Sequence, residues 1–347
     1  MAANGNGSTS AHFVLLGFSE QGHVQVVLFV VLLVLHVITL LGNAGLLVLI
    51  SLLAQLHTPM YFFLSSQSFL ELCYSSCITP RLLWALLHED KAISHTECLM
   101  QFYFYVAFAT TECCLLAAMA YDRCVAVCHP CSTPVHVPRS RHAKVSEPPD
   151  RVFGNSGHPD GCTEFRHQGI CACLVAGFCL VGVTNAALHT GLALRLSFCS
   201  PKGIDHFYCQ GTPLFALSCL DPVPNKLGTF LMAGFSLAAT ILAILLSYAL
   251  SLAAIILAIL LSYTAAGKRK AFSTCASHLA AVALFHGSLV SMYCWRSSSS
   301  SRQPDNVASV FYTMVMPMLN PFICSLRNQE VKARLWRLMG RKHSAEK

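Results

Sequence analysis

Long uninterrupted apolar runs constrain this chain more than any other feature. A transmembrane helix needs about 20 mostly apolar residues, and 54% of the 347 residues are hydrophobic. Only 11% are charged, against about 25% in an ordinary soluble domain, so the chain requires lipid as its solvent. We therefore predict an all-α membrane protein, a seven-transmembrane helix bundle, with spans at about 24–53, 60–87, 99–127, 168–194, 224–250, 271–295 and 305–326.

The predicted domains follow from these spans. Residues 1–23 form an extracellular N-terminus, 24–326 the transmembrane domain and 327–347 a cytoplasmic tail. Residues 1–23 contain no Lys or Arg, so we expect no cleavable signal peptide. Asn6 begins a glycosylation sequon, although such sequons also arise by chance. The tail begins with a short C-terminal amphipathic helix at about 328–339, which places Val331, Leu335 and Leu338 toward lipid and Lys332, Arg334 and Arg337 toward headgroups.

The basic residues are distributed unevenly among the loops. A net charge of +7 would suit a nucleic-acid partner if it formed one patch. Instead, Lys and Arg cluster at Arg139–Arg166, Lys268–Lys270 and Arg327–Lys347, which all fall on one side of the membrane. This is the positive-inside pattern, and it predicts a multi-pass membrane protein with a cytoplasmic C-terminus. The same distribution argues against a nucleic-acid partner.

Two stretches interrupt the regular pattern. Residues 138–167 are rich in Pro, Gly, His and charge, and we expect an aberrant second cytoplasmic loop there. The duplicated segment 236–263 repeats Ser236–Tyr248 as Ser251–Tyr263, with only Thr240 changed to Ile255. The resulting uncharged run is about twice as long as the bilayer core is thick. Either the second copy projects as a helical extension or the register slips by one copy.

Short motifs on these spans point to a family. Asp122 and Arg123 stand side by side at a membrane boundary, where charges are costly and need a reason. With four other strings they resemble the olfactory (odorant) receptor family of rhodopsin-like G-protein-coupled receptors. The strings are Pro59–Leu64 (PMYFFL), Met119–Arg123 (MAYDR), Cys128–Pro130 (CHP), Lys270–Cys275 (KAFSTC) and Pro317–Pro321 (PMLNP).

The resemblance implies an odorant receptor. Such a protein binds a small volatile or hydrophobic ligand within the helix bundle, activates a stimulatory heterotrimeric G protein and raises cyclic AMP. An alternative is a non-signalling or retained member of the same family, and a further one is a transporter or channel. The sequence contains no phosphate-binding glycine loop and no nucleophile elbow, so we expect no enzyme.

Cys98 opens the third span on its outer side, and the following outer loop contains Cys199, Cys209 and Cys219, ten residues apart. This side is an oxidising compartment that permits disulfides. The family pattern implies the pairs Cys98–Cys209 and Cys199–Cys219, while free thiols are the alternative. Most of the 18 cysteines fall inside apolar spans, where cysteine behaves as a small hydrophobic residue.

Two acidic residues, Glu71 and Glu112, lie deep in the second and third spans. A carboxylate in apolar surroundings needs a partner or a proton, and two that face one another can recruit a cation. The resemblance implies a sodium ion here, with Asn43 and Asn320 in the same network, and no other cofactor. The alternative is one neutral, hydrogen-bonded glutamic acid.

The resemblance also assigns a switch that contacts the G protein. Asp122 would hold Arg123 in the resting state, and Tyr248 would move in beside Arg123 on activation. Two positions depart from the family, because Cys124 and Cys324 stand where it usually has tyrosines.

Helical spacing brings the predicted ligand-binding residues together. Four of them share one face of the third span, and the others come from the fifth, sixth and seventh spans. The same residues would also serve as ordinary packing residues. The set is Tyr105, Val106, Ala109, Thr110, Met232, Ser236, His286, Leu289, Val290, Tyr293, Val310 and Thr313.

Overall fold

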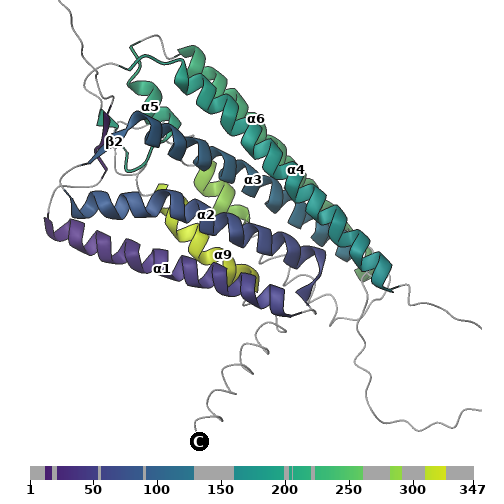
Figure 1. Ribbon diagram of the computed structural model, residues 1–347. Coiled ribbons are helices and arrows are strands. Elements are labelled where there is room, and N and C mark those ends of the chain that lie inside the picture. The colour runs from purple at the N-terminus through teal and green to yellow at the C-terminus, as the bar shows by residue number, and fades with distance from the viewer. Residues whose placement is uncertain are drawn as a thin grey trace, which may run out of the picture.

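The computed structural model describes residues 12–17, 22–53, 56–88, 91–128, 160–198, 203–204, 206–219, 223–260, 282–290 and 309–325. Long helices dominate these residues, and they lie side by side (Figure 1). The helices are α1 (Gly22–Leu52), α2 (Pro59–Leu87), α3 (His95–Cys128), α4 (Asp160–Leu194), α5 (Gly211–Ala216), α6 (Val223–Leu260) and α9 (Met316–Ser325), which continues from the π-helix η4 (Phe311–Val315). Residues 282–290 are also helical.

Four of these helices are long and apolar enough to cross a membrane: His23–Leu52, His95–Asp122, Gly169–Leu194 and Leu227–Leu250. Helix α2 is long, but its buried face also carries polar residues, among them Gln67, Glu71 and Thr79. The described parts of the sixth and seventh predicted spans, 282–290 and 309–325, are short.

Helix α3 is the central element of the bundle. It packs against α2, α4 and α6, while α1 packs against α2 and α9. Helix α4 approaches α3 very closely at Gly182, where an added Cβ would overlap Thr111 Oγ1 and lie 2.5 Å from the Ala107 carbonyl oxygen. Small residues allow this kind of backbone approach between helices in lipid. Helix α4 packs along α3, and it begins at Asp160, inside the predicted irregular loop 138–167.

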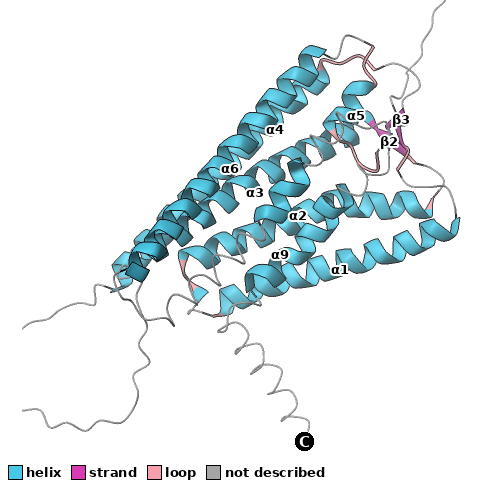
Figure 2. Cartoon of the chain, turned by 180° about the vertical axis from the view of Figure 1, so that it is seen from behind, coloured by secondary structure: helices cyan, strands magenta, loops and turns pink. Residues whose placement is uncertain are grey.

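A small sheet that the sequence did not predict covers one end of the bundle, here called the sheet end (Figure 2). Its central strand β1 (His12–Leu15) pairs antiparallel with β2 (Ala92–Ser94) and parallel with β3 (Gly203–Ile204). The ring of Phe13 is buried against Phe198, with ring centroids 5.1 Å apart. The sheet thus fixes the segment before α1 to the end of the bundle.

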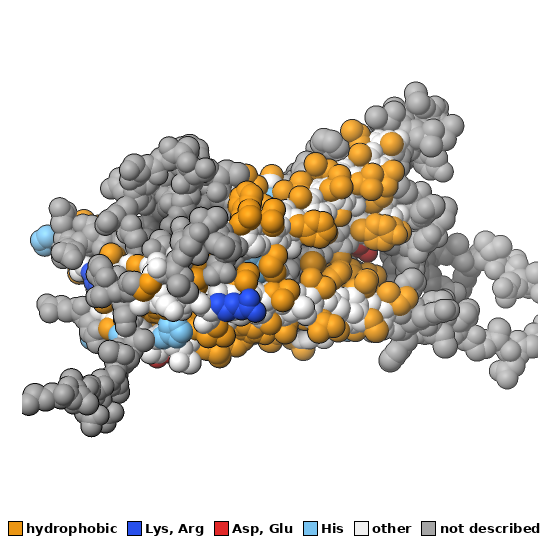
Figure 3. Space-filling model, turned by 90° about the horizontal axis from the view of Figure 1, so that it is seen from above, with side chains coloured by type: hydrophobic (Ala, Val, Ile, Leu, Met, Phe, Trp, Pro, Cys, Tyr) orange, Lys and Arg blue, Asp and Glu red, His pale blue; other side chains and the backbone are white. Residues whose placement is uncertain are grey.

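The duplicated segment forms one continuous helix as far as Leu260. In the first copy, Ile244 is buried and Tyr248 packs against the core, whereas in the second copy Leu252 is exposed. The choice between a helical extension and a register slip stays a prediction, because part of the second copy lies outside the described residues. Large hydrophobic side chains cover much of the outward face seen in Figure 3, as lipid-facing helices require.

Candidate functional site

A polar cluster lies deep between α2, α3 and α9. Asn320 Nδ2 donates hydrogen bonds to Glu71 Oε1 and, at 3.3 Å, to Glu112 Oε1. Gln67 Nε2 donates to the same Glu112 oxygen at 3.3 Å. All four residues are buried, so the structure brings together the two acids and the asparagine that the sequence predicted.

Two buried amide oxygens have no hydrogen-bond partner, Gln67 Oε1 in this cluster and Asn43 Oδ1 on α1. Asn43 is held in place because its Nδ2 donates to Thr39 O and Pro317 O, both at 3.0 Å. Carboxylate and amide oxygens are ligands for hard cations, so this set of atoms fits a sodium ion. Among the described residues there is no cluster of three or more His, Cys, Asp or Glu that could hold a metal ion.

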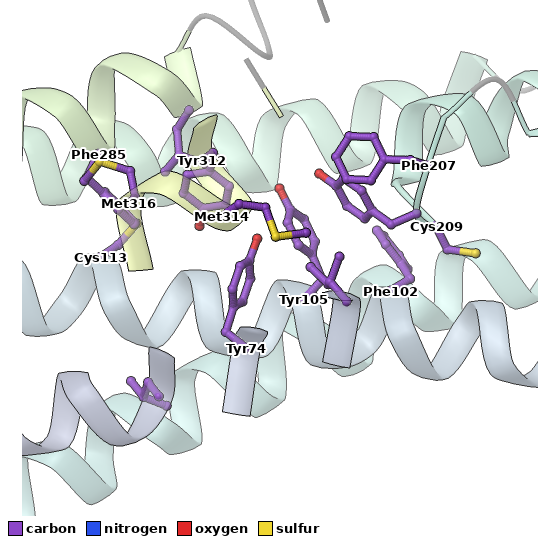
Figure 4. Packing of buried hydrophobic residues seen from close by; sticks show 14 of the residues in the cluster. Tyr74, Phe102, Tyr105, Cys113, Phe207, Cys209, Phe285, Tyr312, Met314 and Met316 are labelled. Carbon is purple, nitrogen blue, oxygen red and sulfur yellow. The ribbon is translucent and has the colours of Figure 1, made fainter. Parts of the chain in front are cut away.

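A layer of aromatic rings separates the polar cluster from the sheet end. Tyr74, Tyr105 and Tyr312 point toward one another from α2, α3 and η4 (Figure 4). The ring centroids of Tyr74 and Tyr312 are 5.8 Å apart, and those of Tyr74 and Tyr105 are 6.0 Å apart. Thr79 Oγ1 contacts the Met314 sulfur at 3.2 Å in the same layer.

A disulfide confirms one predicted pair, because Cys98 and Cys209 are bonded with their Cα atoms 5.4 Å apart. It fixes residues 206–215, here called the lid, against the first turn of α3. The Cys209 amide also donates to Gln101 Oε1 at 2.9 Å. Cys219 is disulfide-bonded as well, but Cys199 lies outside the described residues, so that pair stays a prediction.

A cavity of about 270 Å³ lies beneath the lid, between α3, α4 and α6. Six predicted ligand-binding residues line it: Tyr105, Val106, Ala109, Thr110, Ser236 and Leu289. Five others do not line it, namely Met232, His286, Val290, Val310 and Thr313, and Tyr293 lies outside the described residues.

Sequence reasoning missed the wall that α4 contributes. Val181, Asn185 and His189 line the cavity from that helix, and Asn185 Nδ2 donates to Thr110 Oγ1 at 2.9 Å. The signal was available, since Asn185 and His189 are polar residues four apart in an apolar span. Such residues in a membrane helix usually face its interior.

The predicted switch is described only in part. Asp122 is half-buried near the end of α3, and Tyr248 is partly buried on α6. The side chain of Arg123 lies outside the described residues, as do Asn6 and the predicted helix at 328–339. The assignments of the switch and of glycosylation therefore stay predictions.

The chain is similar in sequence to known proteins over nearly its whole length. The sequence profile of the family described as "Olfactory receptor" matches residues 32–143 and 175–342. The chain is 43% identical to human olfactory receptor 5B21 over 336 residues, which cover 97% of this chain and 98% of that protein. It is also 43% identical to human olfactory receptor 8D4 over 339 residues, 98% of each chain, and to mouse olfactory receptor 5AP2 over 329 residues, 95% and 93% of the two chains.

The chain belongs to the olfactory receptor family. Together with its apolar helices, this makes it a multi-pass membrane protein and an odorant receptor. The profile leaves residues 144–174 unmatched, a stretch that overlaps the predicted irregular loop.

Proposed function

We propose that the chain crosses the plasma membrane seven times, with the sheet end outside the cell. The spans would be α1, α2, α3, α4, α6, the helix containing 282–290 and the helix formed by η4 and α9. In the sequence, the basic clusters follow the ends of α3, α6 and α9 that point away from the sheet end, and the positive-inside rule supports a cytoplasmic location for those ends. The disulfide between Cys98 and Cys209 also lies at the sheet end, and disulfides persist in the extracellular compartment.

The ligand site of this receptor is the cavity between α3, α4 and α6. Its volume of about 270 Å³ suits a small odorant, and apolar side chains make up most of its wall. The observation that carries this proposal is the position of the cavity, directly under a lid that the disulfide fixes to α3.

The polar cluster is the part that couples ligand binding to the G protein. Glu71 and Glu112 would hold a sodium ion, with the amide oxygen of Gln67 as a further ligand, and its positive charge would stabilise the resting arrangement of α2, α3 and α9. A ligand that prefers another arrangement of α3 and α6 shifts the population toward it. Asp122, Arg123 and Tyr248 then present the cytoplasmic surface to a stimulatory G protein, and cyclic AMP rises.

A paired assay of surface expression and cyclic AMP tests this function. The chain, tagged at its N-terminus, is compared with a variant that lacks residues 249–263 and so carries one copy of the repeat. We expect the tag to be accessible outside the cell and an odorant panel to raise cyclic AMP. Surface expression of both forms without any cyclic AMP response would contradict the proposal and favour a non-signalling member of the family.

A further inference from the structure

The sheet end of the cavity is closed in the part of the chain that the structure describes. Phe102, Tyr208, Cys209 and Gln210 are all buried there. The lid also presses closely on α3, because a Cβ added at Gly211 would lie 3.1 Å from the ring of Phe102. With the disulfide holding this contact, a ligand cannot pass between the lid and α3 without displacing packed side chains.

The opposite wall of the cavity reaches the outer surface of the part of the bundle that the structure describes. Helices α4 and α6 each pack along α3, and they lie beside one another on the same flank in both ribbon views (Figures 1 and 2). Near the sheet end, Gly228 lies against Leu192, with 3.6 Å between an added Cβ and the leucine Cδ1. Further along, three residues that line the cavity are also exposed, namely Val181 on α4 and Phe235 and Ala239 on α6. Phe235 is 77% exposed.

The lining of the cavity limits the chemistry of its ligand. No Asp, Glu, Lys or Arg is among the described residues that line it. An ionised ligand would therefore lose its hydration without gaining a countercharge, at a large cost in free energy. The buried Thr229 hydroxyl lines the cavity and has no hydrogen-bond partner, so it can donate to a ligand oxygen.

We propose that a neutral, lipid-soluble molecule with one oxygen acceptor enters this cavity from the bilayer, through the gap between α4 and α6. Val181, Phe235 and Ala239 form the edges of this lateral opening. Thr229 donates a hydrogen bond to the oxygen of the ligand. The inference rests on the proposed position of the ligand site, but not on signalling.

A photolabelling experiment on the full chain in lipid nanodiscs tests the opening. The probe is a ten-carbon alkanol that carries a diazirine, and the corresponding carboxylate is its charged counterpart. Mass spectrometry then locates the label. We expect the alkanol to label peptides that contain 181–189 and 229–240, and the carboxylate to leave them unlabelled.

Tryptophan substitutions at two adjacent alanines distinguish entry of the probe from its binding in the cavity. Ala239 and Ala238 are both exposed on α6, but only Ala239 lines the cavity. We expect Ala239→Trp to slow labelling when the probe is added to finished nanodiscs, and to preserve labelling when the probe is present during reconstitution. Val181→Trp should act in the same way from α4, whereas Ala238→Trp should leave both rates unchanged.

A second pair tests the polar contact. Thr229 and Thr190 each have a buried hydroxyl without a partner, but Thr190 does not line the cavity. A hydrogen bond contributes about 0.5–1.5 kcal/mol, so Thr229→Val should weaken competition by unlabelled decanol about 2- to 10-fold. Thr190→Val should leave competition unchanged.

The outcomes also distinguish this inference from the proposed receptor function. If Ala239→Trp and Val181→Trp do not slow labelling, lateral entry is wrong, even if an odorant still raises cyclic AMP. Strong labelling by the carboxylate would overturn the neutral ligand class. The chain could also show the expected labelling pattern without any cyclic AMP response. This result would support the inference and contradict only the proposed signalling.

Discussion

Helices α2 and α4 differ in the side chains that they bury and expose, although both belong to the same bundle. The inward face of α2 carries the buried Gln67, Glu71 and Thr79, and the helix lies inside the bundle. Helix α4 is strongly apolar, yet Leu180 and Val181 are exposed. In lipid, an apolar side chain gains little by leaving the bilayer, while a polar one gains a partner by turning inward. Hydropathy therefore identifies α4 more readily than α2, although the central helix α3 is also apolar enough to cross a membrane.

The contrast also separates two kinds of stabilisation. The interior is held by hydrogen bonds among Asn320, Glu71 and Glu112, whereas α4 is held by the close backbone approach at Gly182. Polar interactions and small-residue packing are the two main ways to join helices in a membrane. Four predictions test whether the interior depends on hydrogen bonds and α4 on close backbone packing.

The largest effect on stability is expected when an asparagine of the polar interior is replaced by alanine, with the same replacement on α4 for comparison. Asn320→Ala leaves two buried carboxyl groups without their shared donor, and should destabilise the chain by about 3 kcal/mol. Asn185→Ala removes one half-buried hydrogen bond to Thr110 and should cost about 1 kcal/mol. Thermal unfolding in nanodiscs gives the comparison, and equal losses would show that the interior is no more dependent on polar contacts than the flank.

Two glycines of α4 provide the next test. Gly182→Ala forces α4 away from the Ala107 carbonyl and Thr111, and overpacking of this kind costs about 1–3 kcal/mol. Gly177→Ala is the matched control, because an added Cβ there meets nothing within 4 Å. The measurement is again thermal unfolding. A variant Gly182→Ala as stable as Gly177→Ala would mean that α4 is not held by close approach to α3.

A third prediction concerns the ion in the polar cluster. Sodium at about tenfold excess over its dissociation constant should stabilise the chain by about 1.4 kcal/mol. Choline chloride at the same ionic strength serves as the control. Glu112→Gln keeps the shape of the side chain and removes its charge, so this variant should lose the response to sodium. Equal stabilisation by the two salts would contradict a specific ion site.

The sequence predicted the long helices well, because a span in lipid must be both long and apolar. It also predicted the association of Glu71, Glu112 and Asn320, since buried acids need partners, and the disulfide between Cys98 and Cys209 is confirmed. It did not predict the sheet around β1, because strands of two to four residues are set by tertiary contacts rather than by local pattern.

The α4 wall of the cavity was missed for a different reason. Hydrophobic periodicity alone does not show which side of α4 faces the bundle, because most residues of its apolar part are hydrophobic, and only the polar Asn185 and His189 mark that side. Gly182 sets that side through its contact with α3. Val181 and Asn185 then fall at the cavity, although neither was among the predicted ligand-binding residues.

The smallest effect is expected from the tyrosine layer. The buried hydroxyl of Tyr74 has no hydrogen-bond partner, while its ring packs against Tyr105 and Tyr312. Tyr74→Phe keeps the ring and removes a polar group that burial penalises, so stability should stay equal or rise by up to about 1 kcal/mol. Tyr74→Leu is the contrasting variant, because it removes the ring contacts and should destabilise. If Tyr74→Phe is instead destabilised by thermal unfolding, the hydroxyl has a partner such as an ordered water. The hydrogen-bonded interior would then extend from Glu71 to the aromatic layer, and it would differ even more from α4, which is held by close backbone packing.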